Sequence, residues 1–277
     1  MTAATSDLMQ QLSDMLAALC ATDPRNLLAG GDGARIYDSP LVGVADANDA
    51  LYATLKDPAV IGPAHLSPAE WLPGARSVVS YFLPFSSAVR RANRGQGMVA
   101  PEWVTARFDG EAFNNVLRAE LAASLRSAGG EAIVPPLTPR YAVTARRSNW
   151  SERHTAFIAG LGTFGLSKSM ITERGSAGRF GSAITSLSIP SSPRPYSGVY
   201  ERCPWLVDGR CGACIARCPS GAITAAGKDV AVCSHYLDNV IKPLFSPRYG
   251  CGKCQTAVPC EAMIPGAAVG VLHVPKT

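Results

Sequence analysis

Residues 203–219 read CPWLVDGRCGACIARCP, and this stretch decides how the last part of the chain folds. A second group follows it, with Cys233 alone and then CGKCQTAVPC over residues 251–260. Each half contains a C-x2-C pair with a further cysteine a few residues away, which is typical of a doubled ferredoxin fold. The spacing predicts two 4Fe-4S clusters, and therefore a protein that transfers electrons.

The proline after the fourth cysteine indicates how the two halves share their ligands. In two-cluster ferredoxins the last cysteine of a C-x2-C-x2-C-x3-C-P run ligates the other cluster. We therefore expect two ligand sets, one of Cys203, Cys211, Cys214 and Cys260 and the other of Cys218, Cys233, Cys251 and Cys254.

One position departs from the ferredoxin pattern, which places its first cysteine where this chain has Asp208. Cys203 completes the set of eight, so we expect it to ligate, with Asp208 or an open iron site as the alternative. A pair of zinc sites with four cysteines each also uses C-x2-C spacing. The C-x3-C-P run with its distant partner favours iron-sulfur clusters over zinc.

The composition is that of a globular protein with a mild positive charge. The 277 residues carry a formal net charge of +5 and a pI near 8.8, but no run of five or six Lys or Arg residues, so nucleic-acid binding is weakly supported. The first residues lack the basic segment of a secretion signal, and no apolar run is long enough to span a membrane. We expect a cytoplasmic protein with reduced thiols, in which Cys20 is a core residue.

The sequence divides where cysteine density rises. Residues 190–198 (PSSPRPYSG) have the composition of a linker, so we expect an α/β domain over residues 1–195 and a cysteine-rich domain over residues 196–277. In the first domain, residues 77–83 read as a buried strand and residues 111–127 as a helix. Alternation between residues 183 and 189 predicts another strand. The predicted fold class is α+β.

The loop GLGTFG at residues 160–165 matches the G-x-G-x-x-G pattern of dinucleotide-binding folds. That fingerprint requires a strand before the loop and a helix after it, whereas residues 151–159 read as a helix and residues 175–181 contain three glycines. NAD, NADP or flavin on a Rossmann fold is therefore disfavoured. Glycines this dense indicate backbone that lies close to another segment or to a large flat ligand.

Four segments together resemble the epoxyqueuosine reductase family, which is related to cobalamin-dependent reductive dehalogenases. They are PGARSVVSYFLPF (73–85), ERHTAFIAGLGTFGLSK (152–168), RFGSAITSLSI (179–189) and the cysteine block. The resemblance implies a nitroreductase-like cobalamin-binding domain followed by a two-cluster ferredoxin-like domain that delivers single electrons to the cobalt. It also implies cofactor contacts from the glycine loop and its neighbours, namely Gly160, Leu161, Gly162, Thr163, Phe164, Gly165, Ser167 and Arg153.

Two departures from the family bear on substrate and mechanism. The chain ends at Thr277 without the C-terminal helical-repeat extension of full-length members, so we expect a small-molecule substrate rather than transfer RNA. The family's catalytic aspartate lies upstream of the glycine loop, where this chain reads RRSNW (146–150) with no acid before Glu152. The proton donor, or the reaction, is therefore expected to differ.

Three residues near the glycine loop could supply a proton: His154, Tyr141 and Glu152. His154 carries a side chain that titrates near neutral pH, and Tyr141 could donate from its phenol. Each also has a simpler structural interpretation, as a packed or surface histidine, a core tyrosine and a solvated carboxylate at a helix start. The neighbouring arginines at positions 146, 147 and 153 could bind an anionic substrate or the phosphate of a corrinoid.

Three functions are open at this point. The first is cobalamin-dependent reductive cleavage of a small molecule, by deoxygenation or dehalogenation, with electrons from an external ferredoxin, flavodoxin or reductase. The second is a ferredoxin-type electron-transfer protein without chemistry of its own. The third is a corrinoid reductase or activator. Tight retention of cobalamin would exclude the pure electron carrier.

Overall fold

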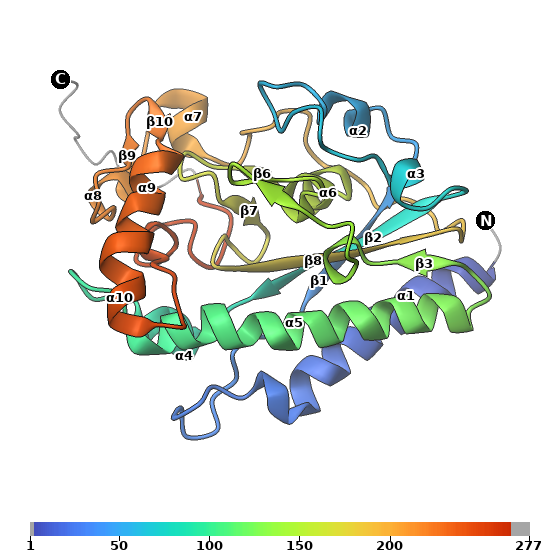
Figure 1. Cartoon of the computed structure of the whole chain (residues 1–277), viewed down its shortest axis with the longest axis horizontal. Coiled ribbons are helices and arrows are strands. Elements are labelled where there is room, and N and C mark those ends of the chain that lie inside the picture. The colour runs from blue at the N-terminus through green and yellow to red at the C-terminus, as the bar shows by residue number, and fades with distance from the viewer. Residues whose placement is uncertain (1–2, 267–277) are drawn as a thin grey trace.

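The computed structural model describes residues 3–266, in which an antiparallel sheet lies between two layers of helices (Figure 1). The four strands lie in the order β1-β2-β8-β3. Their bounds are β1 Leu41–Asp46, β2 Ser77–Pro84, β8 Gly178–Thr185 and β3 Ala132–Ile133. The mixed helix and sheet class predicted from the sequence is confirmed.

Strand β2 is buried along its whole length because it pairs with β1 on one side and β8 on the other. Successive side chains of a strand point to opposite faces. Val79, Tyr81 and Leu83 therefore pack into one core, and Val78 and Phe82 pack into the other. The buried strand expected over residues 77–83 is present in the structure.

Two long helices, α1 (Ala3–Thr22) and α5 (Pro101–Ser127), cover the first face of the sheet (Figure 1). Helix α5 begins ten residues before the predicted start, because Pro101 is well suited to a first helical turn. Position 110 inside this helix requires glycine, because a side chain there would collide with the ring of Tyr37. Cys20, with 1% of its surface exposed, lies in this core as predicted.

The opposite face carries α6 (Glu152–Ile158) and the hairpin of β6 (Gly162–Phe164) and β7 (Met170–Thr172). Strand β8 ends at Thr185, four residues before the predicted end, because later amides bond side-chain oxygens: Leu187 donates to Thr185 Oγ1 at 3.2 Å, and Ile189 donates to Ser77 Oγ at 2.9 Å. The shorter elements of this part are α2 Leu51–Thr54, α3 Pro68–Trp71, α4 Ser87–Ala92, β4 Val143–Thr144, β5 Arg147–Ser148 and the 3-10 turns Pro24–Asn26 and Pro135–Leu137.

The cysteine-rich part consists of short elements on one end of the sheet. A continuous helical rod, formed by α9 (Val230–Tyr236), a π-helical turn (Leu237–Ile241) and α10 (Lys242–Phe245), stands against α5 (Figure 1). The remaining elements are α7 Pro204–Asp208, α8 Ala213–Ala216, β9 Ile223–Thr224, β10 Gly227–Lys228 and the 3-10 turn Lys253–Gln255.

The segment between the two parts, residues 186–203, contains neither helix nor strand. It is nevertheless anchored, because the buried Tyr196 hydroxyl donates to the carbonyl of Phe157 at 2.8 Å and accepts from the amide of Gly162 at 3.1 Å. The domain boundary after residue 195 stays a prediction.

Buried cations join the cysteine-rich part to the loop that follows α4. Lys253 is 2% exposed and donates to the carbonyls of Asn93 at 3.2 Å and Gly95 at 2.9 Å. Arg217 donates to the same two carbonyls. In the opposite direction, the side-chain amide of Asn93 donates to the carbonyl of Cys251 at 3.0 Å. The cysteine loops are thus held at a fixed position on the sheet part. Within residues 3–266, no helix has the length and apolarity that crossing a membrane requires.

Candidate functional site

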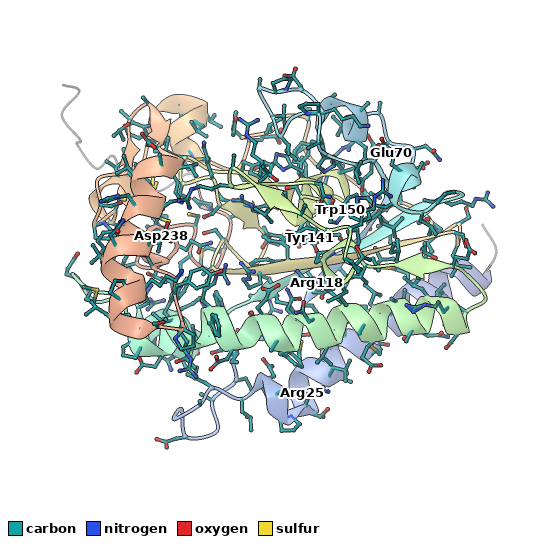
Figure 2. All side chains as sticks on the ribbon, in the orientation of Figure 1. Arg25, Glu70, Arg118, Tyr141, Trp150 and Asp238 are labelled. Carbon is teal, nitrogen blue, oxygen red and sulfur yellow. The ribbon has the colours of Figure 1, made fainter. Side chains whose placement is uncertain are left out.

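A cavity of about 670 Å³ lies between the sheet part and the cysteine-rich part. Tyr141 and Glu152 line it on one side, and Cys233, Cys251 and Cys254 line it on the other. Its volume is within the range of small-molecule and cofactor sites. Figure 2 shows Tyr141, Trp150 and Arg118 gathered near the middle of the molecule, between α5 and the opposite layer.

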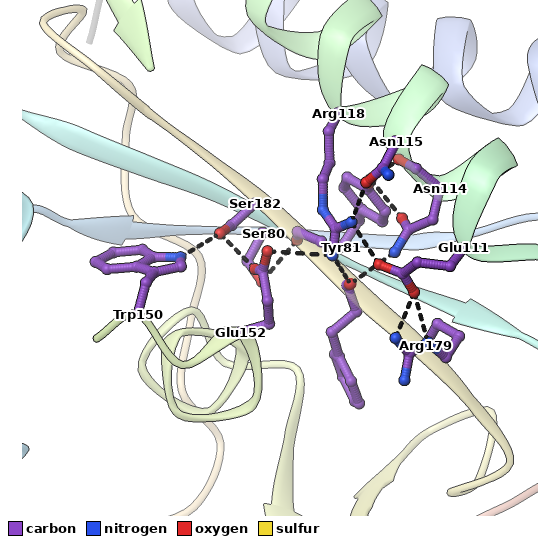
Figure 3. A network of polar contacts seen from close by, with 12 residues as sticks. Ser80, Tyr81, Glu111, Asn114, Asn115, Arg118, Trp150, Glu152, Arg179 and Ser182 are labelled. Carbon is purple, nitrogen blue, oxygen red and sulfur yellow. Dashed lines mark hydrogen bonds and ion pairs between the residues drawn. The ribbon is translucent and has the colours of Figure 1, made fainter. Parts of the chain in front are cut away.

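One wall of the cavity holds Glu152 in a short chain of hydrogen bonds (Figure 3). The buried indole of Trp150 donates from Nε1 to Ser182 Oγ at 3.0 Å, and Ser182 Oγ donates to Glu152 Oε2 at 2.5 Å. Glu152 is the first residue of α6, and Ser182 lies on β8. The carboxyl group is therefore positioned by the sheet, whereas a solvated helix-start carboxylate was the simpler reading of the sequence.

Arg118 connects this wall to α5 (Figure 3). Its guanidinium lies 3.4 Å from Glu152 Oε1, donates to Glu111 Oε1 at 2.6 Å and donates to the carbonyl of Phe180 at 3.1 Å. Arg179 also donates to Glu111. Burial alone would raise the pKa of Glu111, but the two arginines outweigh it and lower that pKa to about 2.

At Glu152, in contrast to Glu111, the effect of burial on the pKa outweighs the effect of the neighbouring charges. Its burial raises its pKa above the ordinary value of a glutamic acid, and the nearby Arg118 and the Ser182 hydroxyl reduce that rise without cancelling it. Glu152 Oε1 is a buried oxygen without a hydrogen-bond partner among the described residues. The side chain therefore retains a proton to a higher pH than Glu111 does.

The other two candidate proton donors differ in position. Tyr141 lines the cavity, and burial raises its pKa. His154 does not line it: its ring packs on Phe164 with centroids 4.8 Å apart, and its Nδ1 lies 2.7 Å from Ser151 Oγ. Burial and the nearby Arg153 lower the pKa of His154 to about 4, so its imidazole is neutral at physiological pH.

The glycine loop packs largely against the protein itself. A side chain at Gly160 would collide with the carbonyl of Pro193, and one at Gly162 would collide with the carbonyl of Ile171. Of the two neighbours that the sequence left open for these glycines, another segment of the chain is the one found there. Among the predicted cofactor contacts, Ser167 and Arg153 line the large cavity, whereas Gly160, Leu161, Gly162, Thr163, Phe164 and Gly165 do not.

Several cations line the cavity without an acidic partner. Within residues 3–266, Arg107, Arg153, Lys168 and Lys228 have no carboxylate within 4.0 Å. The Arg107 guanidinium lies over the ring of Tyr249, 5.3 Å from its centroid, and burial together with Arg179 lowers its pKa. These charges favour a ligand that carries an anionic group.

The first predicted ligand set surrounds a second, smaller cavity. Cys203, Cys211, Cys214 and Cys260 all line this space of about 20 Å³, together with apolar side chains such as Leu166 and Ile171. Burial raises the pKa of Cys260 to about 12 and raises that of Cys214, and neighbouring sulfurs add to the rise at both. Bound iron would offset this cost, because cations stabilise thiolates.

The alternative ligand Asp208 points elsewhere. Its carboxylate pairs with Arg210 at 2.6 Å at the end of α7, and it does not line the small cavity. Cys203, by contrast, is buried and lines that cavity.

The second predicted set lies where the large cavity meets the cysteine-rich part. Cys233, Cys251 and Cys254 line the cavity, and the remaining sulfur, of Cys218, lies near enough to raise the pKa of Cys251 along with the other two. Burial is the main cause of that rise, to about 11. Within residues 3–266, no three His, Cys, Asp or Glu side chains converge as ligands of a single metal ion.

Solved structures share this arrangement of elements. An epoxyqueuosine reductase structure with an epoxyqueuosine-modified tRNA stem loop matches 93% of this chain at 18% identity, with a TM-score of 0.56. The chain has the fold of the epoxyqueuosine reductases. The enzyme from Bacillus subtilis matches 98% of the chain at 17% identity and a TM-score of 0.55, and a catabolic reductive dehalogenase matches 92% at 17% and 0.53. The resemblance expected from the sequence is confirmed at the level of the fold.

The chain spans about two thirds of the length of these reductases, 66% and 68%, and 37% of the dehalogenase. No protein-family model matches the sequence, and no curated protein matches it. The expectation that transfer RNA is not a partner is wrong, because a reductase with this fold has been solved with a tRNA stem loop.

Sequence reasoning missed the residues that hold Glu152. Arg118, Glu111 and Asn115 recur at intervals of three and four along α5, which places them on one face of that helix. This polar stripe, which runs beside the buried apolar face of the helix, is the signal that was available. No sequence pattern links it to Ser182 or Arg179 on β8, since these contacts depend on how α5 crosses the sheet.

Proposed function

We propose that this chain is an iron-sulfur oxidoreductase that binds cobalamin in the large cavity and reductively cleaves a carbon-oxygen or carbon-halogen bond. In this proposal residues 1–195 form a nitroreductase-like domain and residues 196–277 form a two-cluster ferredoxin-like domain. One observation carries it: the same cavity reaches from three cysteines of one predicted cluster site to the Glu152 and Tyr141 wall. Electrons and a proton would thus arrive from opposite sides.

The cysteines would hold the two clusters in the sets predicted from spacing. Cys203, Cys211, Cys214 and Cys260 would bind the cluster in the small apolar cavity. Cys218, Cys233, Cys251 and Cys254 would bind the one beside the large cavity. Apolar surroundings exclude water and favour a low reduction potential.

The walls of the large cavity have the chemistry to hold a corrinoid. Its volume of about 670 Å³ is in the range of small-molecule and cofactor sites, and its polar side chains could bind the amide groups that surround a corrin. When bound, cobalamin supplies a low-valent cobalt that is a strong reductant and nucleophile. The chain's own residues would bind and orient the ligands, exclude water and supply a proton.

The ligand or substrate would carry an anionic group, held by Arg107, Lys168 and Lys228, which lack acidic partners in the described part of the chain. Two substrate classes fit such charges. One is RNA, because an epoxyqueuosine reductase of this fold was solved with a tRNA stem loop. The other is a small aromatic acid, because a dehalogenase of this fold was solved with 3-bromo-4-hydroxybenzoic acid. The electron donor would be an external ferredoxin, flavodoxin or reductase.

The decisive experiment is anaerobic purification with cobalamin supplied, followed by analysis of iron, sulfide and cobalt and by absorption spectra before and after dithionite. We expect about eight irons and one cobalt per chain, with a spectral change of the cobalt on reduction. Cys233→Ala should lower the iron content, whereas Cys20→Ala, in the sheet core, should not.

Each other outcome identifies a different function. Iron without retained cobalt would contradict the cobalamin reductase and indicate an electron-transfer protein. Retained cobalt that is reduced, with no turnover of a tRNA stem loop or of a halogenated aromatic acid, would indicate a corrinoid reductase or activator. Zinc in place of iron would contradict all three.

A further inference from the structure

We infer that Glu152 is the residue that donates the proton in the reductive step, and that Ser182, Trp150 and Arg118 position it. This inference rests on the proposed function. It assigns to this chain a donor at the start of α6, rather than an aspartate upstream of the glycine loop. The reasons lie in the geometry of one wall of the cavity.

The first reason is access. Glu152 lines the large cavity together with Tyr141 and Trp150, across from the predicted cluster ligands Cys251 and Cys254. A cofactor that accepts electrons from that cluster would lie between the two walls. A substrate bound on its far side would then face the Glu152 wall.

The second reason is a fixed orientation. Ser182 Oγ accepts from Trp150 Nε1 at 3.0 Å, so its own hydrogen is directed to Glu152 Oε2 at 2.5 Å (Figure 3). Glu152 Oε2 thus accepts a fixed hydrogen bond, while Oε1 is a buried oxygen that lies 3.4 Å from the Arg118 guanidinium and has no hydrogen-bond partner in the described chain. Pre-positioning of this kind is what general acids require.

The third reason is that the wall accommodates both charge states. The groups that face Glu152 are Arg118 and Glu111 on α5, Arg179 on β8, Tyr81 on β2, and the phenols of Tyr52 and Tyr141. Burial favours the protonated acid before the reaction. After the proton has left, Arg118, 3.4 Å from Oε1, stabilises the carboxylate.

For reductive dehalogenation the chemistry balances with one proton from Glu152; removal of an epoxide oxygen as water takes a second proton, which solvent in the cavity would supply. In reductive dehalogenation the carbon-halogen bond breaks, two electrons enter, the halide leaves with its electron pair, and a new carbon-hydrogen bond forms with the donated proton. The two electrons come one at a time from the external donor through the clusters. Glu152 then regains its proton from solvent that enters the open cavity.

The two other candidates are weaker donors. His154 lies off the cavity and is neutral at physiological pH, since burial lowers its pKa to about 4. Tyr141 lines the cavity, but burial raises the pKa of a phenol that is already a far weaker acid than a carboxyl group. Glu152 combines access with suitable acidity.

The test compares Glu152→Gln and Glu152→Asp in the cofactor-loaded full chain, with 3-bromo-4-hydroxybenzoic acid and an epoxyqueuosine-modified tRNA stem loop as the two substrate probes. Glu152→Gln should lower turnover about 100-fold, while iron and cobalt contents and the dithionite-reduced spectrum stay unchanged. Glu152→Asp should recover part of the activity. Glu102→Gln, an exposed acid in the first turn of α5, is the matched control and should keep full activity.

The pH profile separates proton donation from a structural role. The acid must be protonated, so wild-type turnover should fall as pH rises through the raised pKa of Glu152, and this fall should disappear in Glu152→Gln. Unchanged turnover in Glu152→Gln, or a loss accompanied by loss of cobalt, would overturn the inference.

A readout without substrate keeps the two proposals distinguishable. The infrared carbonyl band of a protonated carboxyl, present in the wild type and absent in Glu152→Gln, should persist above the ordinary pKa of glutamic acid. If neither probe is turned over but this band persists, the proposed reaction fails while the protonated Glu152 stands. If the band titrates with the ordinary pKa, the assignment of Glu152 as the proton donor is wrong.

Discussion

The sheet part and the cysteine-rich part of this molecule are stabilised in different ways. The sheet is covered on both faces by apolar side chains that form two continuous cores. In the cysteine-rich part the elements are short, and several large apolar side chains are exposed, including Val207 at 59% and Leu244 at 63%. The apolar cluster beside the cysteines has only four buried members, Leu166, Ile171, Cys203 and Ile223, with further cysteines packed against it. The comparison indicates that hydrophobic burial stabilises one part, and that bound metal would stabilise the other.

The largest effect should follow removal of iron. In small metal-dependent domains the bound metal contributes on the order of 10 kcal/mol to folding. The backbone amides of the cysteine-rich part should therefore lose their protection from hydrogen exchange in the apoprotein, while those of the sheet strands stay protected. Hydrogen exchange followed by mass spectrometry measures both parts in one sample. Equal protection of the amides of residues 203–260 from exchange, with and without iron, would contradict the statement that bound metal stabilises the cysteine-rich part.

The second effect should follow Gly252→Ala. Gly252 has a positive φ of 62°, and a side chain there would collide with the indole of Trp103 on α5, so the loop that carries Cys251 and Cys254 would have to move. We expect loss of about half of the iron, one cluster of two. Gly221→Ala is the matched control, because Gly221 has a similar φ of 66° and open space beside it. Equal iron in both variants would contradict the prediction.

The third prediction compares two leucines, one from each part of the molecule. Leu117 on α5 is fully buried in the sheet core, whereas Leu244 on α10 is 63% exposed. Leu117→Ala should lower the free energy of unfolding by about 3 kcal/mol because it leaves a cavity, and Leu244→Ala should change it by less than about 0.5 kcal/mol. Denaturant unfolding of the sheet part measures both. Iron content should stay unchanged in Leu117→Ala.

The smallest effect concerns Cys20, the cysteine outside the predicted ligand sets. It is 1% exposed in the sheet core, and burial raises the pKa of its thiol to about 12. Cys20→Ala should cost about 1 kcal/mol and leave the iron content unchanged. In the native protein the thiol should resist alkylation up to alkaline pH, because the thiolate is the reactive form. Rapid alkylation of native Cys20 would place it outside the core.

The elements predicted most closely were those with a strong local pattern. The apolar run of residues 77–83 required a buried strand, and the strand is buried on both faces. The start of α5 and the end of β8 were misplaced, because periodicity shows neither the first-turn proline Pro101 nor the tertiary hydrogen bond from the Ile189 amide to Ser77 Oγ. The glycine loop was read correctly as a close approach of backbone, but only the structure identified the neighbours as Pro193 and Ile171.

The sequence by itself determined the eight cysteines, their spacing and the central strand, because these depend on residue type and on distances along the chain. Tertiary structure alone decided that the Glu152 carboxylate lies in the cavity wall beside Ser182 and Arg118. Glu152 and Ser182 are 30 residues apart, and Arg118 reaches them from a third element. Their contact exists because α5 and α6 cover opposite faces of one sheet, where Arg118 reaches Glu152 past the edge of β8. Burial there, rather than the identity of the residue, gives Glu152 its raised pKa.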